Sequence, residues 1–158
     1  MLRASDLINT VITTLQSITD FVTAMNGAQN IKAHTFQDGI ARSIIDDIYQ
    51  MTSPSTLVVY EGTMGGNFDA KTLWKHMVTI YMKAANVATE QNPMGYEDLI
   101  WMVVNGPVNG TSLNIRQIDL IPGKLRTMET PSIIRLADQT GTDFFKIECV
   151  FPEIGDAS

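Results

Sequence analysis

The stretch Thr72-Leu-Trp-Lys-His-Met-Val-Thr-Ile-Tyr-Met-Lys-Ala-Ala85 decides the fold, because its side chains alternate as in one long β-strand. One side of that strand is apolar and includes the histidine: Trp74, His76, Val78, Ile80 and Met82. The other side mixes Lys75, Thr79 and Lys83 with Leu73, Met77 and Tyr81. At about 3.3 Å per residue the strand would run roughly 45 Å, close to the width of a compact domain of this size. We therefore expect it to reach an edge of the molecule or a neighbouring subunit.

The composition fits one soluble domain spanning residues 1–158. Charged residues make up only 18%, which is compatible with surface that becomes buried between subunits. The net charge is −6 and the chain has 11 Lys and Arg residues, so it lacks the clustered cations of a general nucleic-acid binder. We expect no sequence-specific nucleic-acid partner.

The single cysteine, Cys149, excludes an internal disulfide and lies in an apolar segment, as a reduced core thiol would. The N-terminus lacks the basic and apolar blocks of a signal peptide, and no apolar run is long enough to cross a membrane. These features predict synthesis in a cytoplasm and no membrane association.

Three segments have the apolar spacing of amphipathic helices. The first runs from a cap at Ser5 to Met25 and stops at Asn26-Gly27. The second covers about 38–51, and the third follows Asn92-Pro93 and stops before Gly106.

The remaining segments are typical of strands. A short strand at 57–60 is followed by a Gly-rich connection at 63–70 that leads into the long strand. Strands at 113–120 and 133–136 follow, and a hairpin turn leads into a last strand at 142–151 that Pro152 ends. This order predicts an α+β fold, with a mostly antiparallel sheet and helices packed on one face.

No residue pattern points to catalysis, a cofactor or a metal. His34 and His76 have no Cys or carboxylate at metal-ligand spacing, and His76 is better explained as a satisfied core or interface histidine. No serine lies in a nucleophile elbow, and the glycines at 62–66 lack the Lys and Ser/Thr of a phosphate loop. We expect a protein that is not an enzyme.

The order of these elements resembles the tail terminator (tail completion) proteins of long-tailed bacteriophages. The resemblance covers about Ser5 to Glu153, and its weight lies in residues 57–85 and 133–153. It rests on a leading helix, a Val-Val-Tyr strand, the long strand, a helix containing Asp98-Leu-Ile-Trp101 and a last hairpin that closes in Phe-Lys-Ile-Glu-Cys-Val-Phe-Pro-Glu.

This resemblance implies a structural virion protein that forms a ring, usually a hexamer, on the finished tail tube. Such a ring stops tube polymerisation and joins the tube to the head connector, so the implied partners are further copies of the chain, the tail tube protein and a head-connector or neck protein. The implied location is the tail or neck of the virion, after synthesis in the host cytoplasm. The family has no catalytic residues to transfer.

Two loops are candidates for contacts in such an assembly. Their candidate interface residues are Met64, Asn67, Phe68, Lys124, Arg126 and Met128. Two alternatives stay open within the structural class, a head-closure or neck adaptor protein and another minor tail protein. From a different class, a small ligand-binding α+β domain would need a pocket with convergent polar groups.

Overall fold

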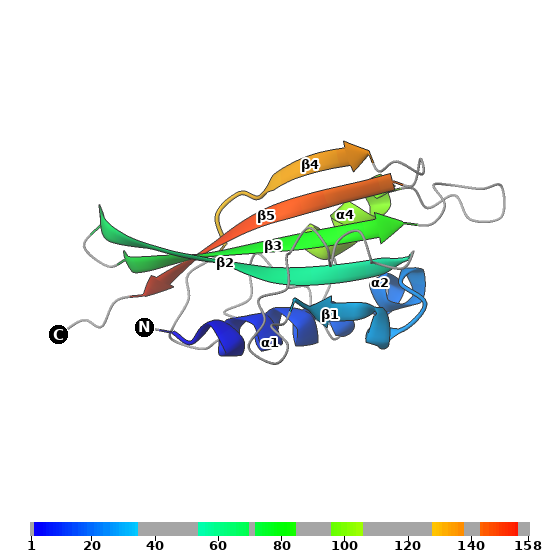
Figure 1. Ribbon diagram of the computed structural model, residues 1–158, viewed down its shortest axis with the longest axis horizontal. Helices are drawn as coiled ribbons and strands as arrows, with labels where there is room; N and C mark the ends of the chain where they lie inside the picture. The colour runs from blue at the N-terminus through cyan, green and yellow to red at the C-terminus, as the bar shows by residue number, and fades with distance from the viewer. Residues whose placement is uncertain are drawn as a thin grey trace.

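The structure, a computed structural model, describes residues 2–34, 54–69, 72–84, 96–105, 128–137 and 143–154. These residues form an α+β fold built on a five-stranded sheet in the order β1-β2-β3-β5-β4. Strand β1 runs parallel to β2, and the other neighbours are antiparallel. The helices pack on one face of this sheet, as the sequence predicted (Figure 1). The strands are β1 (Ile31–Ala33), β2 (Ser55–Asp69), β3 (Thr72–Ala84), β4 (Ser132–Ala137) and β5 (Asp143–Ile154), and the helices are α1 (Ala4–Gln16), α2 (Thr19–Ala24), the 3-10 helix η1 (Ala28–Asn30) and α4 (Tyr96–Asn105).

The long strand predicted from Thr72 is confirmed as β3, which pairs with β2 on one side and β5 on the other. Its apolar face is also as predicted, because His76, Val78, Ile80 and Met82 are all buried beneath the helix layer. A strand with partners on both edges needs apolar residues at these positions because the helices cover them. The core therefore lies between the helices and the inner face of the sheet.

The N-terminal segment is two helices rather than the one predicted from Ser5. Helix α1 begins after Arg3 without a side-chain cap, so the predicted cap at Ser5 is also wrong. The chain breaks at Ser17, whose hydroxyl donates to the carbonyl of Thr14 at 2.6 Å, and at Ile18, which is extended. Hydroxyl groups that bond back to the preceding turn compete with the helix ladder. The break lets Ile18 and Phe21 both enter the core.

The predicted stop at Asn26-Gly27 is correct, and the backbone explains it. Asn26 has φ 58°, and its N–H donates to the carbonyl of Thr23 at 3.1 Å. The N–H of Gly27 donates to the carbonyl of Val22 at 3.0 Å. This pair of bonds is the Schellman end of a helix, with asparagine in the left-handed position that glycine more often takes.

Strand β2 is much longer than the predicted 57–60, and the segment expected to be a Gly-rich connection is its second half. A bulge at Glu61 interrupts the register between Tyr60 and Gly62, and Gly62 has φ 127°. Beyond the bulge the strand pairs again, so that Gly65 lies opposite Trp74. Backbone pairing with β3 outweighed the weak strand propensity of the glycines.

Two further differences concern the ends of strands. Strand β1 lies in a segment for which no strand was predicted, and Pro152 does not end β5, which continues to Ile154. Strand β4 begins at Ser132 opposite Glu148, so at Pro152 only β3 flanks β5. Proline is tolerated at such an edge position because no second neighbour needs its missing N–H.

The predicted helix after Asn92-Pro93 and the strand at 133–136 correspond to α4 and β4. The predictions for 38–51 and 113–120 lie outside the described residues. Within the described part of the chain, no helix is long and apolar enough to span a membrane.

Candidate assembly surfaces

The hairpin of β2 and β3 contains the first group of candidate contact residues. Its closed end lies at the left of Figure 1, past the start of α1. Met64 is 48% exposed there, as a contact residue would be. Asn67 and Phe68 lie in the last part of β2 rather than in a loop.

The second group is less accessible. Met128 is 3% exposed and packs in the core, so its side chain does not lie on the surface. Its neighbour Glu129 donates its N–H to the carbonyl of Val150 at 3.0 Å, which places this segment beside β5. Lys124 and Arg126 lie outside the described residues.

Among the residues that the structure describes, four large apolar side chains are exposed: Met64, Trp101, Ile133 and Ile134. Trp101 is 57% exposed on α4, on the side of the helix that also carries the exposed residues Asp98 and Asn105. Ile133 and Ile134 are consecutive residues on the edge strand β4 and therefore point to opposite faces of the sheet. Exposed apolar residues on a strand edge are typical of surfaces that pair with another chain.

A buried polar network lies at the base of the β2–β3 hairpin. His76 is fully buried, and its Nε2 lies 2.6 Å from Oε2 of Glu153. Its Nδ1 lies 2.9 Å from the hydroxyl of Tyr60. An imidazole that donates from Nε2 to the carboxylate satisfies both contacts, because the hydroxyl of Tyr60 can either donate to Nδ1 or accept from it. The sequence interpretation of His76 as a satisfied core histidine is confirmed.

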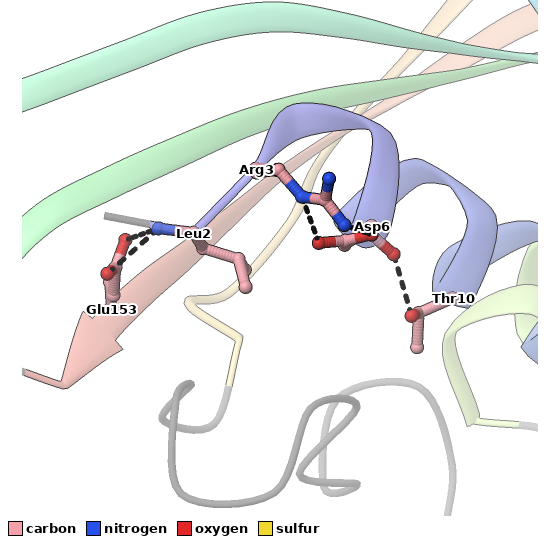
Figure 2. A network of polar contacts seen from close by, with 5 residues as sticks. All are labelled: Leu2, Arg3, Asp6, Thr10 and Glu153. Atoms are coloured by element: carbon pink, nitrogen blue, oxygen red, sulfur yellow. Dashed lines mark hydrogen bonds and ion pairs between the residues drawn. The ribbon is translucent and has the colours of Figure 1, made fainter.

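Glu153 also binds the N-terminal segment. The N–H of Leu2 lies 3.1 Å from both carboxylate oxygens, and Figure 2 shows this contact beside the Arg3–Asp6 ion pair of the first turn of α1. Burial alone would raise the pKa of Glu153. The hydrogen bonds from His76 and Leu2, together with the positive charges of His76 and of the N-terminus, outweigh burial and lower this pKa. The network therefore ties the N-terminal segment to β2, β3 and β5.

Sequence inspection missed Glu153 as a partner of His76. The signal was present, since Glu153 is two residues past Phe151 and so has the parity of the buried face of the last strand. The expectation that Pro152 ends the strand removed Glu153 from that pattern.

The face of the sheet opposite the helices has a hollow of about 420 Å³. We call it the outer-face hollow, and its lining residues come from three adjacent strands: Glu61 from β2, Met77, Val78, Thr79 and Tyr81 from β3, and Lys146, Glu148, Cys149 and Val150 from β5. Lys146 pairs with Glu148 at 3.0 Å, and the hydroxyl of Tyr81 donates to Glu61 at 3.4 Å.

The lining groups titrate according to these contacts. Burial, followed by the nearby carboxylate of Glu61, raises the pKa of Tyr81. The hydrogen bond to Glu148 raises the pKa of Lys146. Burial raises the pKa of the Cys149 thiol to about 12, so the thiol stays protonated and is a poor nucleophile at neutral pH.

No protein-family model matches this chain, and a search among curated proteins finds no match. The fold is that of an α+β domain in which helices cover one face of a mostly antiparallel sheet.

One similar solved structure is a chain of the "virion of native gene transfer agent (GTA) particle". The similarity covers 96% of this chain and 97% of that chain, with a TM-score of 0.50 and 9% sequence identity. At this level of identity, the similarity establishes a shared fold.

Proposed function

We propose that this chain is a structural protein of a phage-like virion. The observation that carries this proposal is the similarity in fold to a chain of a gene transfer agent virion, which extends over 96% of one chain and 97% of the other. Coverage of both chains from end to end means that the likeness is not confined to a small motif. The protein's location is then the virion, after synthesis in the host cytoplasm.

Within that class we propose the tail terminator: a ring, of six copies in the family that the sequence resembles, that caps the tail tube and joins it to the head connector. The support is a set of surfaces on different sides of the molecule, namely the exposed Met64 on the hairpin, the edge strand β4 and the exposed Trp101 on α4. A subunit of a ring needs two different surfaces for its two neighbours and further surfaces for the rings above and below.

We propose no catalytic role. Both ring nitrogens of His76 are used inside the core, and the thiol of Cys149 is buried and protonated. We therefore assign the imidazole of His76 and the thiol of Cys149 a structural role in the core.

The alternatives predict other partners. A head-closure or neck adaptor protein would bind the head connector without limiting tube length. A small ligand-binding domain would use the outer-face hollow, whose lining includes hydroxyl, carboxylate and ammonium groups.

The test of the terminator role is to add the purified protein to polymerising tail tube subunits and to measure tube lengths by electron microscopy. A terminator shortens the tubes and is found at one end of each. Tubes of unchanged length without bound protein would contradict the terminator role, and binding to connector particles alone would favour the neck adaptor.

A further inference from the structure

We propose that residues 2–6 form an N-terminal strap whose release from the sheet is coupled to the hairpin of β2 and β3 through the buried pair of Glu153 and His76. The strap opens while the rest of α1 stays in the core, and its opening loosens the base of the hairpin. This device belongs to the single chain, so it does not depend on the proposed function.

The strap itself contributes little to the core. None of its residues is buried, whereas Leu7, Ile8 and Val11, which follow in α1, are core residues. Helix α1 begins without a side-chain cap, and the ion pair of Arg3 and Asp6 joins two residues of the strap to each other. A segment with few buried side chains opens at a low cost in free energy while the core stays folded. The strap is therefore able to open separately from the remainder of α1.

Glu153 anchors the strap to the sheet. The N–H of Leu2 lies 3.1 Å from both carboxylate oxygens of Glu153, at the end of β5 (Figure 2). The side chain of Leu2 is partly buried and packs against the core. A hydrogen bond to an ionised carboxylate is stronger than one between neutral groups. Loss of the charge on Glu153 should therefore favour the open strap.

The same carboxylate connects the strap to the hairpin. Oε2 of Glu153 lies 2.6 Å from Nε2 of His76, and Nδ1 of His76 lies 2.9 Å from the hydroxyl of Tyr60. Tyr60 is the last residue of β2 before the bulge at Glu61. Hydrogen bonds that follow one another in a buried network polarise each other, so the loss of one end weakens the rest. The network thus runs from the backbone of the strap to the point where β2 changes its register.

The hairpin beyond the bulge is the element that responds. Gly62 has φ 127° with open space around it, and the next residues, 63–65, are exposed. Since side chains do not enclose this part of β2, its order depends on its pairing with β3 and on the contacts at its base. The buried network supplies contacts at that base, so the state of the strap should affect the hairpin.

Limited digestion with trypsin at neutral pH tests the strap, because Arg3 lies within it. Cleavage after Arg3 requires the strap to leave the helix and the sheet. Cleavage after Lys146 requires the sheet to open, because Lys146 lies inside β5 with β3 on one side and β4 on the other. Mass spectrometry measures both initial rates, and the ratio of the rate at Arg3 to the rate at Lys146 separates opening of the strap from global unfolding.

Two variants test the anchor and the coupling. Glu153→Gln removes the charge that holds the strap and should raise this ratio by at least about tenfold. Tyr60→Phe removes a hydroxyl that makes no hydrogen bond to the strap among the described residues, and it should still raise the ratio by at least about twofold because His76 connects the two. In the reverse direction, hydrogen exchange of the backbone at 62–69 should quicken by at least about twofold once the chain is cleaved after Arg3.

Matched controls remove the same chemical groups outside the network. Tyr81→Phe removes a hydroxyl that contacts Glu61, and Glu129→Gln removes the charge of a carboxylate that pairs with Lys75. Both should leave the ratio of cleavage rates unchanged. None of these substitutions alters the residues next to Arg3 or Lys146, so trypsin meets the same two sites in every variant.

The outcomes decide both halves of the proposal. An unchanged ratio in Glu153→Gln would mean that the strap opens only when the whole sheet unfolds, and the proposal would be wrong. A ratio that rises in Glu153→Gln but not in Tyr60→Phe, with unchanged exchange at 62–69 after cleavage, would mean that the strap is not coupled to the hairpin and would overturn the proposal as well. A rise in both variants, with both controls unchanged, supports it.

Discussion

At the scale of single residues, the carboxylate of Glu153 has the most contacts in the buried network, and it should make stability depend on pH. Its folded-state pKa is lowered from an ordinary value of 4.5, so its stabilising contribution is present above that value and is lost as the pH falls through the folded-state pKa. We expect the melting temperature to drop as the pH is lowered from about 5 to about 3.

The control is Glu153→Gln, which keeps the size of the side chain and removes the charge. This variant should be less stable than the parent at neutral pH, and part of its acid dependence should be gone. Parallel curves of melting temperature against pH for the two proteins would show that other carboxylates dominate.

Tyr60→Phe tests the other side of the imidazole. It removes the hydroxyl that lies 2.9 Å from Nδ1 of His76 and leaves that buried nitrogen without its partner. The expected loss is about 1–3 kcal/mol in the free energy of unfolding, measured by urea titration. Tyr81→Phe is the matched control, because its hydroxyl donates to the exposed Glu61 at 3.4 Å, a longer contact that lies outside the buried network. Equal losses in both variants would mean that the network adds nothing specific.

At the scale of elements, the hairpin of β2 and β3 depends on two glycines for different reasons. A methyl group at Gly65 would lie 2.3 Å from the ring of Trp74, whereas Gly62 has open space around it but φ 127°. Gly62→Ala should cost about 1–2 kcal/mol through backbone strain. Gly65→Ala should instead displace the Trp74 ring, which a shift in tryptophan fluorescence would reveal.

The fluorescence spectrum should be unchanged in Gly62→Ala, because that residue does not touch the ring. A spectrum that shifts in Gly62→Ala and not in Gly65→Ala would contradict this division. Trp101 contributes to the same signal, so both variants are best made in a Trp101→Phe background.

Trp74 is also opposite Glu153 in the register of β3 and β5. Trp74→Asp would place a second carboxylate beside Glu153 on the inner face, where like charges on paired strands repel. We expect a destabilised or unfolded chain, measured by urea titration, whereas Trp74→Phe should lose far less. A fully stable Trp74→Asp variant would show that this end of the sheet does not contribute to the core.

At the scale of the whole molecule, the sheet and its helix layer should unfold together because one cluster of side chains connects them. Phe145 of β5 is fully buried in that cluster, and Phe145→Ala should cost about 3–5 kcal/mol. Trp101→Ser removes an exposed ring and should change stability by less than about 0.5 kcal/mol. If Trp101 contacts a partner, the same variant should assemble poorly while melting normally.

The elements that the sequence predicted correctly share a local signal. The alternation from Thr72, the Asn26-Gly27 stop and the helix before Gly106 each depend on neighbours in the chain, and the structure has all three. The errors occur where a partner distant in sequence decides the outcome. The Gly-rich half of β2 is a strand because β3 pairs with it, and β5 continues past Pro152 because β4 has already ended.

The candidate sites follow the same division. The sequence identified Met64 as a surface residue, but it could not show that Met128 is buried or that Glu61 and Thr79 line one hollow with Lys146. Glu61 and Lys146 are 85 positions apart in the chain numbering, and only the order β2-β3-β5 brings them together.

By itself, the sequence determined which face of the long strand is buried, where the first helical segment stops and that the fold is α+β, because residue spacing and backbone preference act over a few neighbouring positions. The tertiary structure decided the partners of His76, the length of β2 and β5 and the residues that meet on the outer face. Those features depend on the register between strands, which is set by packing across the whole sheet.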